Sequence, residues 1–123
     1  MREKMHAAHP NTSGLFDVKH DRGGMIDLEF IVQYLVLAHA ARHAELTGNL
    51  GNIALLGIAA RLGLIPAELA ERCRVAYREF RRLQHALRLA GAKYARVPPA
   101  RVAEHAAAAR ELWDRVFATW RGR

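Results

Sequence analysis

The sequence predicts an all-α protein, a bundle of four to five helices with one short strand-like segment near its start. Apolar residues recur at intervals of three and four over residues 66–90 and 102–120, which places them on one face of a helix. Glycine follows the apolar pattern at Gly63 and Gly91, where helices commonly end. No repeat, low-complexity tract or linker interrupts the chain, so residues 1–123 are expected to form a single helical domain.

The first half of the chain predicts three helices. Residues 1–9 favour a helix that ends at the turn cluster beginning with Pro10, and residues 15–19 are the strand-like stretch. A second helix is expected from about Gly24 to about Ala44; it is apolar on nearly every face, as is typical of a central, buried helix. After a loop, a third helix is expected to end at Gly63.

The second half predicts two longer helices, each with one apolar stripe. The fourth runs from about Pro66 to Ala90, and the last follows the "VPP" turn and runs to about Trp120. The stripe of the fourth helix comprises Leu69, Cys73, Ala76, Phe80, Leu83 and Leu87. That of the last helix comprises Val102, Ala106, Ala109, Trp113, Val116 and Trp120.

Composition limits the class of protein. Of 123 residues, 51% are hydrophobic and 25% charged, enough to bury a core. The single cysteine, Cys73, excludes an intrachain disulfide and fits a reducing cytoplasm. The longest apolar run is far shorter than the roughly 20 residues that span a bilayer, so no membrane association is expected. The net charge of +7, carried mostly by arginine, is compatible with an anionic partner; the alternative is a GC-rich genome that supplies arginine in place of lysine.

The segment "KHDRGGMIDLEF", residues 19–30, concentrates charge where a buried helix begins. Paired glycines allow a ligand to approach the backbone, and the first amides of a helix suit a phosphate. Lys19 and Arg22, just before Gly23 and Gly24, would add positive charge to such a site. The alternative is a glycine turn with solvated charges, because neither complete glycine-rich phosphate motif is present.

Two acids follow the glycines. Asp27 and Glu29 are two residues apart, so they point to different faces of a helix and cannot act as a pair. They could stabilise the helix N-terminus. Because a buried acid needs a partner, an ion pair with Lys19 or Arg22 is the interpretation we favour from sequence.

The fourth helix carries a second candidate surface. Arg74, Arg78, Arg81, His85 and Arg88 follow the same four–three spacing, roughly opposite the apolar stripe. This face could dock on phosphate or on an acidic protein surface. The alternative is a solvated face that Glu71 and Glu79 partly neutralise.

Nothing in the sequence alone indicates catalysis or metal binding. His39 and His43 are four residues apart, but no third ligand accompanies them. Cys73 falls within an apolar stripe and is expected in the core.

The stretches "GLFDVKHDRGGMIDLEFIVQYLVLAHA" and "ELTGNLGNIALLGIAARLGLIP" resemble the C-terminal region of the glutamine synthetase adenylyltransferase family. Phe16-Asp17-x-Lys19, Gly23-Gly24-Met25 and Asp27-x-Glu29-Phe30 carry the resemblance, with Gln33-Tyr34 and "AYREFRRLQHALRL" in support. A related pattern occurs in the uridylyltransferase of the same nitrogen circuit, but "IDLEFIVQYLVL" fits the adenylyltransferase better.

The resemblance implies a piece of a larger cytoplasmic enzyme that adenylylates and de-adenylylates glutamine synthetase. Its catalytic domains use ATP and Mg²⁺ and are regulated by glutamine and a PII-type signal protein. The helical bundle would follow the adenylylating domain. The metal-binding Gly-Ser…Asp-x-Asp motif of those domains is missing here, so this chain is expected to be non-catalytic and to hold neither ATP nor Mg²⁺ tightly by itself.

The resemblance also implies a place for the charged segment. Lys19, Arg22, Gly23, Gly24, Asp27 and Glu29 would lie at the junction with the preceding catalytic domain, facing the nucleotide or locking the two domains together. A competing interpretation is a free-standing basic helical module that binds nucleic acid or an acidic protein through the arginine face. A third is a purely structural bundle whose exposed apolar surface meets the catalytic domain.

Overall fold

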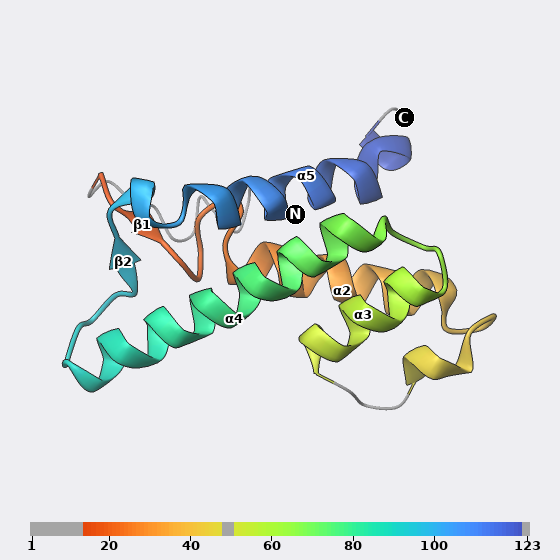
Figure 1. The fold of residues 1–123 in the computed structure, drawn as a ribbon, viewed down its shortest axis with the longest axis horizontal. Helices are drawn as coiled ribbons and strands as arrows, with labels where there is room; N and C mark the ends of the chain where they lie inside the picture. The colour runs from red at the N-terminus through yellow and green to blue at the C-terminus, as the bar shows by residue number, and fades with distance from the viewer. Residues whose placement is uncertain (1–13, 48–50, 122–123) are drawn as a thin grey trace.

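The structure is a computed structural model, which describes residues 14–47 and 51–121, with side chains as far as residue 118. Its elements form a mostly helical fold with one two-stranded antiparallel sheet, which confirms the predicted class (Figure 1). The helix expected over residues 1–9 lies outside the described residues. In chain order the elements are β1 (Phe16–Asp17), α2 (Met25–His39), the 3₁₀-helix η1 (Ala44–Thr47), α3 (Asn52–Arg61), α4 (Ala67–Leu89), β2 (Arg96–Val97), the 3₁₀-helix η2 (Pro99–Arg101) and α5 (Ala103–Arg121).

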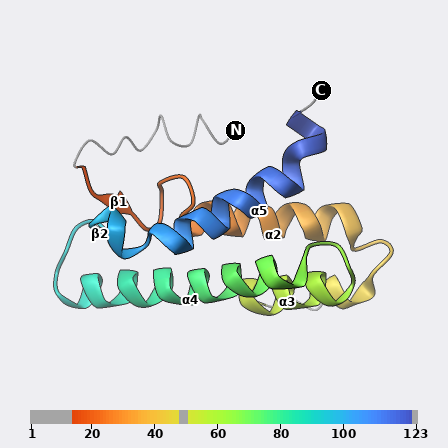
Figure 2. The same cartoon turned by 45° about the horizontal axis from the view of Figure 1, so that its top comes forward.

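The α-helices pack in two layers. Figure 2 shows α2 and α5 in one layer above α3 and α4 in the other. The helix α4 packs against α3 and α5, and the small sheet lies at one end of the molecule, beside the start of α5. A single hydrophobic core runs between the layers and extends to the sheet.

The predicted stripe of α4 forms the centre of this core. Five of its six members are buried, and Leu87, near the end of the helix, is partly buried. The Phe80 ring stacks on Phe16 of β1, with ring centroids 6.0 Å apart. The four–three spacing therefore predicted which side of α4 faces the protein.

The stripe of α5 is also confirmed for the residues whose side chains are described. Val102, Ala106, Ala109 and Trp113 are buried, and Val116 is partly buried. The side chain of Trp120 lies outside the described part. The stripe is wider than expected, because Ala108, Leu112 and Phe117 are buried as well.

The helix α2 is shorter and less enclosed than its sequence predicts. It ends at His39 rather than near Ala44, and a turn over residues 40–43 leads into η1. Leu37 is 82% exposed and Tyr34 is also exposed, so the expectation of a helix buried on every face is wrong for its second half, where only one side contacts the other helices. In the part of the chain that the structure describes, no helix is long and apolar enough to cross a membrane.

The end of α3 follows the predicted glycine cap. Gly63 adopts a φ of +77°, a left-handed conformation that favours glycine. The N–H of Leu64 then donates to the carbonyl of Ala59 at 2.9 Å, and that of Gly63 to Ala60 at 3.0 Å. Since these bonds use the last carbonyls of the helix, the chain turns directly into α4.

The strand pair joins two distant parts of the chain. Phe16 pairs with Val97 and Asp17 with Arg96, and the N–H of Val18 extends the pairing to the carbonyl of Ala95. The strand-like character of residues 15–19 predicted β1, whereas β2 was not predicted. The pairing brings the charged loop that follows β1 to the end of α4.

Candidate functional site

The loop between β1 and α2 is organised by Asp17, a carboxylate only 3% exposed. Its Oδ1 accepts hydrogen bonds from the backbone N–H groups of Lys19 and His20, both at 3.0 Å. Its own N–H donates to Asp21 Oδ2 at 2.9 Å, and the Arg96 Nε lies 3.4 Å from its Oδ2. These contacts fix the backbone from which the Lys19 side chain projects.

The paired glycines are required for packing. Gly23 has a φ of +87°, and a Cβ there would lie 2.7 Å from the carbonyl oxygen of Ala106 in α5. A Cβ on Gly24 would lie 2.7 Å from the carbonyl oxygen of Val18. Only residues without a side chain allow the loop to approach α5 and its own strand this closely.

The amides of these glycines donate within the chain. The N–H of Gly23 donates to Asp27 Oδ2 at 2.8 Å, and that of Gly24 to the carbonyl of Asp21 at 2.9 Å. The sequence predicted that both amides could bind a phosphate, but in the structure both donate to acceptors of the same loop and of the start of α2. Of the predicted phosphate residues, the basic side chains are therefore the groups left to meet a ligand.

Asp27 and Glu29 face different neighbours, as their spacing predicts. Asp27 is buried and turns back over the start of its own helix to Gly23. Glu29 faces α4, where its Oε2 accepts a hydrogen bond of 2.7 Å from the Tyr77 hydroxyl. That hydroxyl accepts a bond of 3.2 Å from Asn52 Nδ2, so this acid joins α2, α4 and α3.

The ion pair expected for these acids is not formed in the described part of the chain. Neither Lys19 nor Arg22 pairs with Asp27 or Glu29, because each carboxylate turns to a nearer donor and Arg22 is exposed to solvent. The pair at this junction joins Asp17 to Arg96 instead. Sequence reasoning missed it because the two residues meet only through the strand pairing.

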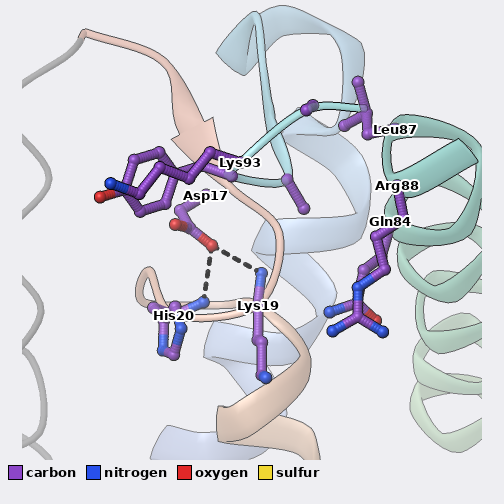
Figure 3. A pocket seen from close by; sticks show the side chains of 10 residues that line it. Asp17, Lys19, His20, Gln84, Leu87, Arg88 and Lys93 are labelled. Atoms are coloured by element: carbon purple, nitrogen blue, oxygen red, sulfur yellow. Dashed lines mark hydrogen bonds between the residues drawn. The ribbon is translucent and has the colours of Figure 1, made fainter. Parts of the chain in front are cut away.

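A cavity of about 200 Å³ lies beside the loop, between the end of α4 and the segment that leads into β2. Figure 3 shows the side chains of Gln84 and Arg88 extending from α4 toward Lys19. Lys93 borders the cavity from the connecting segment. Among its described lining residues, Asp17 is the one acid, and its oxygens already accept three donors. Among the described residues, the cations of this cavity therefore have no further lining carboxylate to pair with.

An exposed tyrosine adds an aromatic wall to this cavity. The guanidinium of Arg96 stacks 4.0 Å from the ring centroid of Tyr94, and Lys93 Nζ lies 5.4 Å from it. Cation–ring contacts of this kind hold the side chains in place. Sequence reasoning missed these residues, although an aromatic residue between two cations in "KYAR" was a local signal.

The arginines of the basic face of α4 differ in whether they have partners within the described residues. Arg78, Arg81 and Arg88 are exposed and form no ion pair within the described residues. Arg74 differs, since its Nε donates to the carbonyl of Ile53 at 3.1 Å and it pairs with Glu71 at 2.9 Å. Arg74 therefore ties α4 to α3 and is not free to meet a partner.

The two glutamates expected to neutralise this face do so only in part. Glu71 pairs with Arg74 as predicted, but Glu79 pairs at 2.6 Å with Arg82, which is not a member of the predicted basic face. The hydrogen bond from Arg82 lowers the pKa of the Glu79 carboxyl. The remaining arginines of the face are left without these acids.

No metal or thiol chemistry is indicated in the described residues. No three histidine, cysteine or acidic side chains gather there in a way that could hold a metal ion. The Cys73 thiol is buried and donates to the carbonyl of Ala108 at 3.3 Å. Burial raises the pKa of this thiol to about 12, as befits a core residue.

Comparison with known proteins finds one matching family model and several similar proteins. Residues 1–114 match the family model described as GlnD PII-uridylyltransferase. The chain is 60% identical over 117 residues to the bifunctional glutamine synthetase adenylyltransferase/adenylyl-removing enzyme of Bordetella bronchiseptica. The aligned region covers 95% of this chain and 12% of that protein. The enzymes of the same name from Burkholderia mallei and Nitrosomonas europaea are 59% and 50% identical, over 95% and 97% of this chain and 13% and 14% of theirs.

These relatives confirm the resemblance found in the sequence. The chain spans only about an eighth of their length, as the shares of 12–14% show. Their names therefore describe proteins much longer than this one.

Proposed function

Since the chain belongs to the family whose model is described as GlnD PII-uridylyltransferase, we propose that it is a non-catalytic helical segment of an enzyme that adenylylates glutamine synthetase and removes the adenylyl group. Its relatives carry that activity in their names. The sequence has no Gly-Ser…Asp-x-Asp stretch, so the carboxylates that hold the metal would come from outside these residues. In this proposal the enzyme is cytoplasmic and is regulated by a PII-type signal protein.

The role proposed for this segment is to bind the phosphates of the nucleotide next to the catalytic domain. The observation that supports it is a cavity lined by Lys19, Arg88 and Lys93, which come from three parts of the chain. Phosphate oxygens are strong acceptors, and a cavity with several cations and one saturated carboxylate favours them electrostatically.

Rigidity of the loop strengthens this interpretation. Because Asp17 fixes the backbone at Lys19 and His20, the loop that carries the lysine need not be ordered when a ligand arrives. The residues fit the triphosphate of ATP but not its Mg²⁺, since the described part of the chain gathers no acidic cluster for a metal. The nucleotide supplies the adenylyl group; this chain supplies charge for the phosphates.

Titration with pyrophosphate and with ATP–Mg²⁺, followed by chemical-shift mapping, tests the proposal. We expect the shifts to cluster in residues 17–21 and 84–95, and we expect Lys19→Ala to weaken binding about tenfold, as the loss of one charge-assisted contact predicts. Arg110→Ala, an exposed arginine on α5 outside the cavity, is the matched control and should bind as the unaltered chain does.

The opposite result has a clear meaning. If neither ligand shifts these residues, or if Lys19→Ala binds pyrophosphate unchanged, the phosphate role is wrong. The same cations would then serve contact with the catalytic domain. In the longer enzyme, Lys19→Ala would in that case lower domain association rather than the rate of adenylyl transfer per folded molecule.

A further inference from the structure

The helix α4 carries six arginines, which differ in whether a carboxylate pairs with them. Three have carboxylate partners: Arg72 with Glu111, Arg74 with Glu71 and Arg82 with Glu79. The other three, Arg78, Arg81 and Arg88, have none within the described residues and lie with the exposed His85 on one side of the helix. We call these four residues the cationic row.

The cationic row is straight and rigid. Its members are three or four residues apart on a helix of 23 residues that packs against α3 and α5. Consecutive side chains are therefore about 5 Å apart along the axis, and the row is about 15 Å long. The three guanidinium groups, at intervals of three and seven residues, match carboxylates at the same intervals on a second helix.

The surroundings of the row favour a protein over a nucleic acid. Leu89, the residue after Arg88, is 77% exposed. An apolar side chain beside charged ones suits the mixed surface of a protein partner. Nucleic-acid binding would favour base-stacking aromatic side chains, and the row contains none.

Acids near the start of the row point in the same direction. Glu71 lies beside it, paired with Arg74. Glu29 and Arg81 line one cavity between α2, α3 and α4. A nucleic-acid strand carries closely spaced charge along its whole length and would be repelled by both carboxylates. A short acidic helix can place its carboxylates on the row and avoid them.

We propose that the cationic row is a docking surface for an acidic amphipathic helix of a partner protein, with carboxylates spaced to meet Arg78, Arg81 and Arg88 and an apolar side chain that meets Leu89. Arginine suits this role, since its planar guanidinium holds a carboxylate through two parallel hydrogen bonds. The surface is separate from the phosphate cavity except at Arg88, which borders both.

The test uses the whole chain and three fluorescent probes at physiological ionic strength. The first is a synthetic helical peptide with glutamate and leucine at the matching intervals; the second has the same composition in scrambled order; the third is a short DNA duplex. We expect the chain to bind the first peptide at least about tenfold more tightly than the other two, because only its charges fall in register with the row. Absence of binding to the first peptide, equal binding of the scrambled peptide, or preference for DNA overturns the proposal.

Charge reversal then locates the contact. Arg78→Glu with Arg81→Glu should weaken binding of the first peptide by about tenfold or more, whereas Arg110→Glu with Arg115→Glu changes the net charge equally on α5 and should weaken it little. Circular dichroism verifies that both variants fold. Arg78→Lys with Arg81→Lys keeps the charge but loses the bidentate geometry, so it should weaken binding less than the charge reversal does.

Equal losses in the two reversal variants would show that net charge alone attracts the peptide, and would overturn the proposal. Arg88 is left unaltered, so pyrophosphate binding by the row variant should persist. That result keeps this inference distinguishable from the proposed phosphate role.

Discussion

Removing the Asp17 carboxylate should destabilise the whole end of the molecule that carries the charged loop. In Asp17→Ala, the backbone N–H groups of Lys19 and His20 lose their acceptor, and Arg96, whose side chain is 20% exposed, loses its counter-charge. Each partly buried group left without a partner costs about 1 kcal/mol or more, so we expect a loss of about 3 kcal/mol in the free energy of unfolding. For a domain of this size that loss lowers the Tm by about 10 °C.

The matched variant is Asp17→Asn, which keeps an oxygen able to accept the two amide bonds but removes the charge that faces Arg96. We expect it to lose about 1 kcal/mol, because only the charge-assisted part of the network is lost. Urea unfolding followed by helical circular dichroism measures both variants, with an unchanged m-value as the sign that the same surface is exposed. A loss below about 0.5 kcal/mol in Asp17→Ala would refute the view that this carboxylate organises the loop.

Three further outcomes follow from the packing. Gly23→Ala should lower the free energy of unfolding in urea by about 2–4 kcal/mol, because Gly23 combines a positive φ with a 2.7 Å approach of the added Cβ to the Ala106 carbonyl oxygen. The control Gly57→Ala, inside α3 and free of a close clash, should be neutral or slightly stabilising. Equal effects of the two variants would contradict the packing argument. The Cys73 thiol, whose pKa burial raises to about 12, should resist iodoacetamide at mildly alkaline pH until urea unfolds the chain; rapid native labelling would contradict its place in the core. Burial, and the hydrogen bond that its hydroxyl donates to a carboxylate on α2, raise the pKa of Tyr77 above its ordinary value of 10.0. This group therefore stabilises the fold below that pH, and its contribution is lost as pH rises through the native pKa. Ultraviolet titration should show one tyrosine ionising at a higher pH than the others, and Tyr77→Phe should abolish that step.

The local sequence pattern predicted the helices well, since the apolar residues that face the core recur every three or four positions along a helix. The α4 stripe from Leu69 to Leu83 and the cap at Gly63 are both as expected. Pattern failed where the partner is distant in the chain. Nothing near Arg96 signals a strand, because β2 exists only by pairing with β1, and the apolar second half of α2 gave no sign that Leu37 would face solvent.

The candidate site was predicted in part for the same reason. Lys19 and Arg88 were both named from sequence, but as members of two separate features, and the structure brings them to one cavity. Asp17 was quoted as part of a motif without a role. Its importance depends on backbone amides and on Arg96, neither of which a side-chain pattern reveals.

The β1–β2 pairing also sets an order for folding. It closes a loop of about 80 residues that contains α2, α3 and α4, and closing so long a loop has a large entropic cost until the enclosed helices have docked. The pairing is therefore expected late, and the short ribbon should open more readily than the helices between its strands. Amide exchange at Val18, which donates to Ala95 across the ribbon, would then report how often the cavity beside the β1–α2 loop opens while the helical core stays intact.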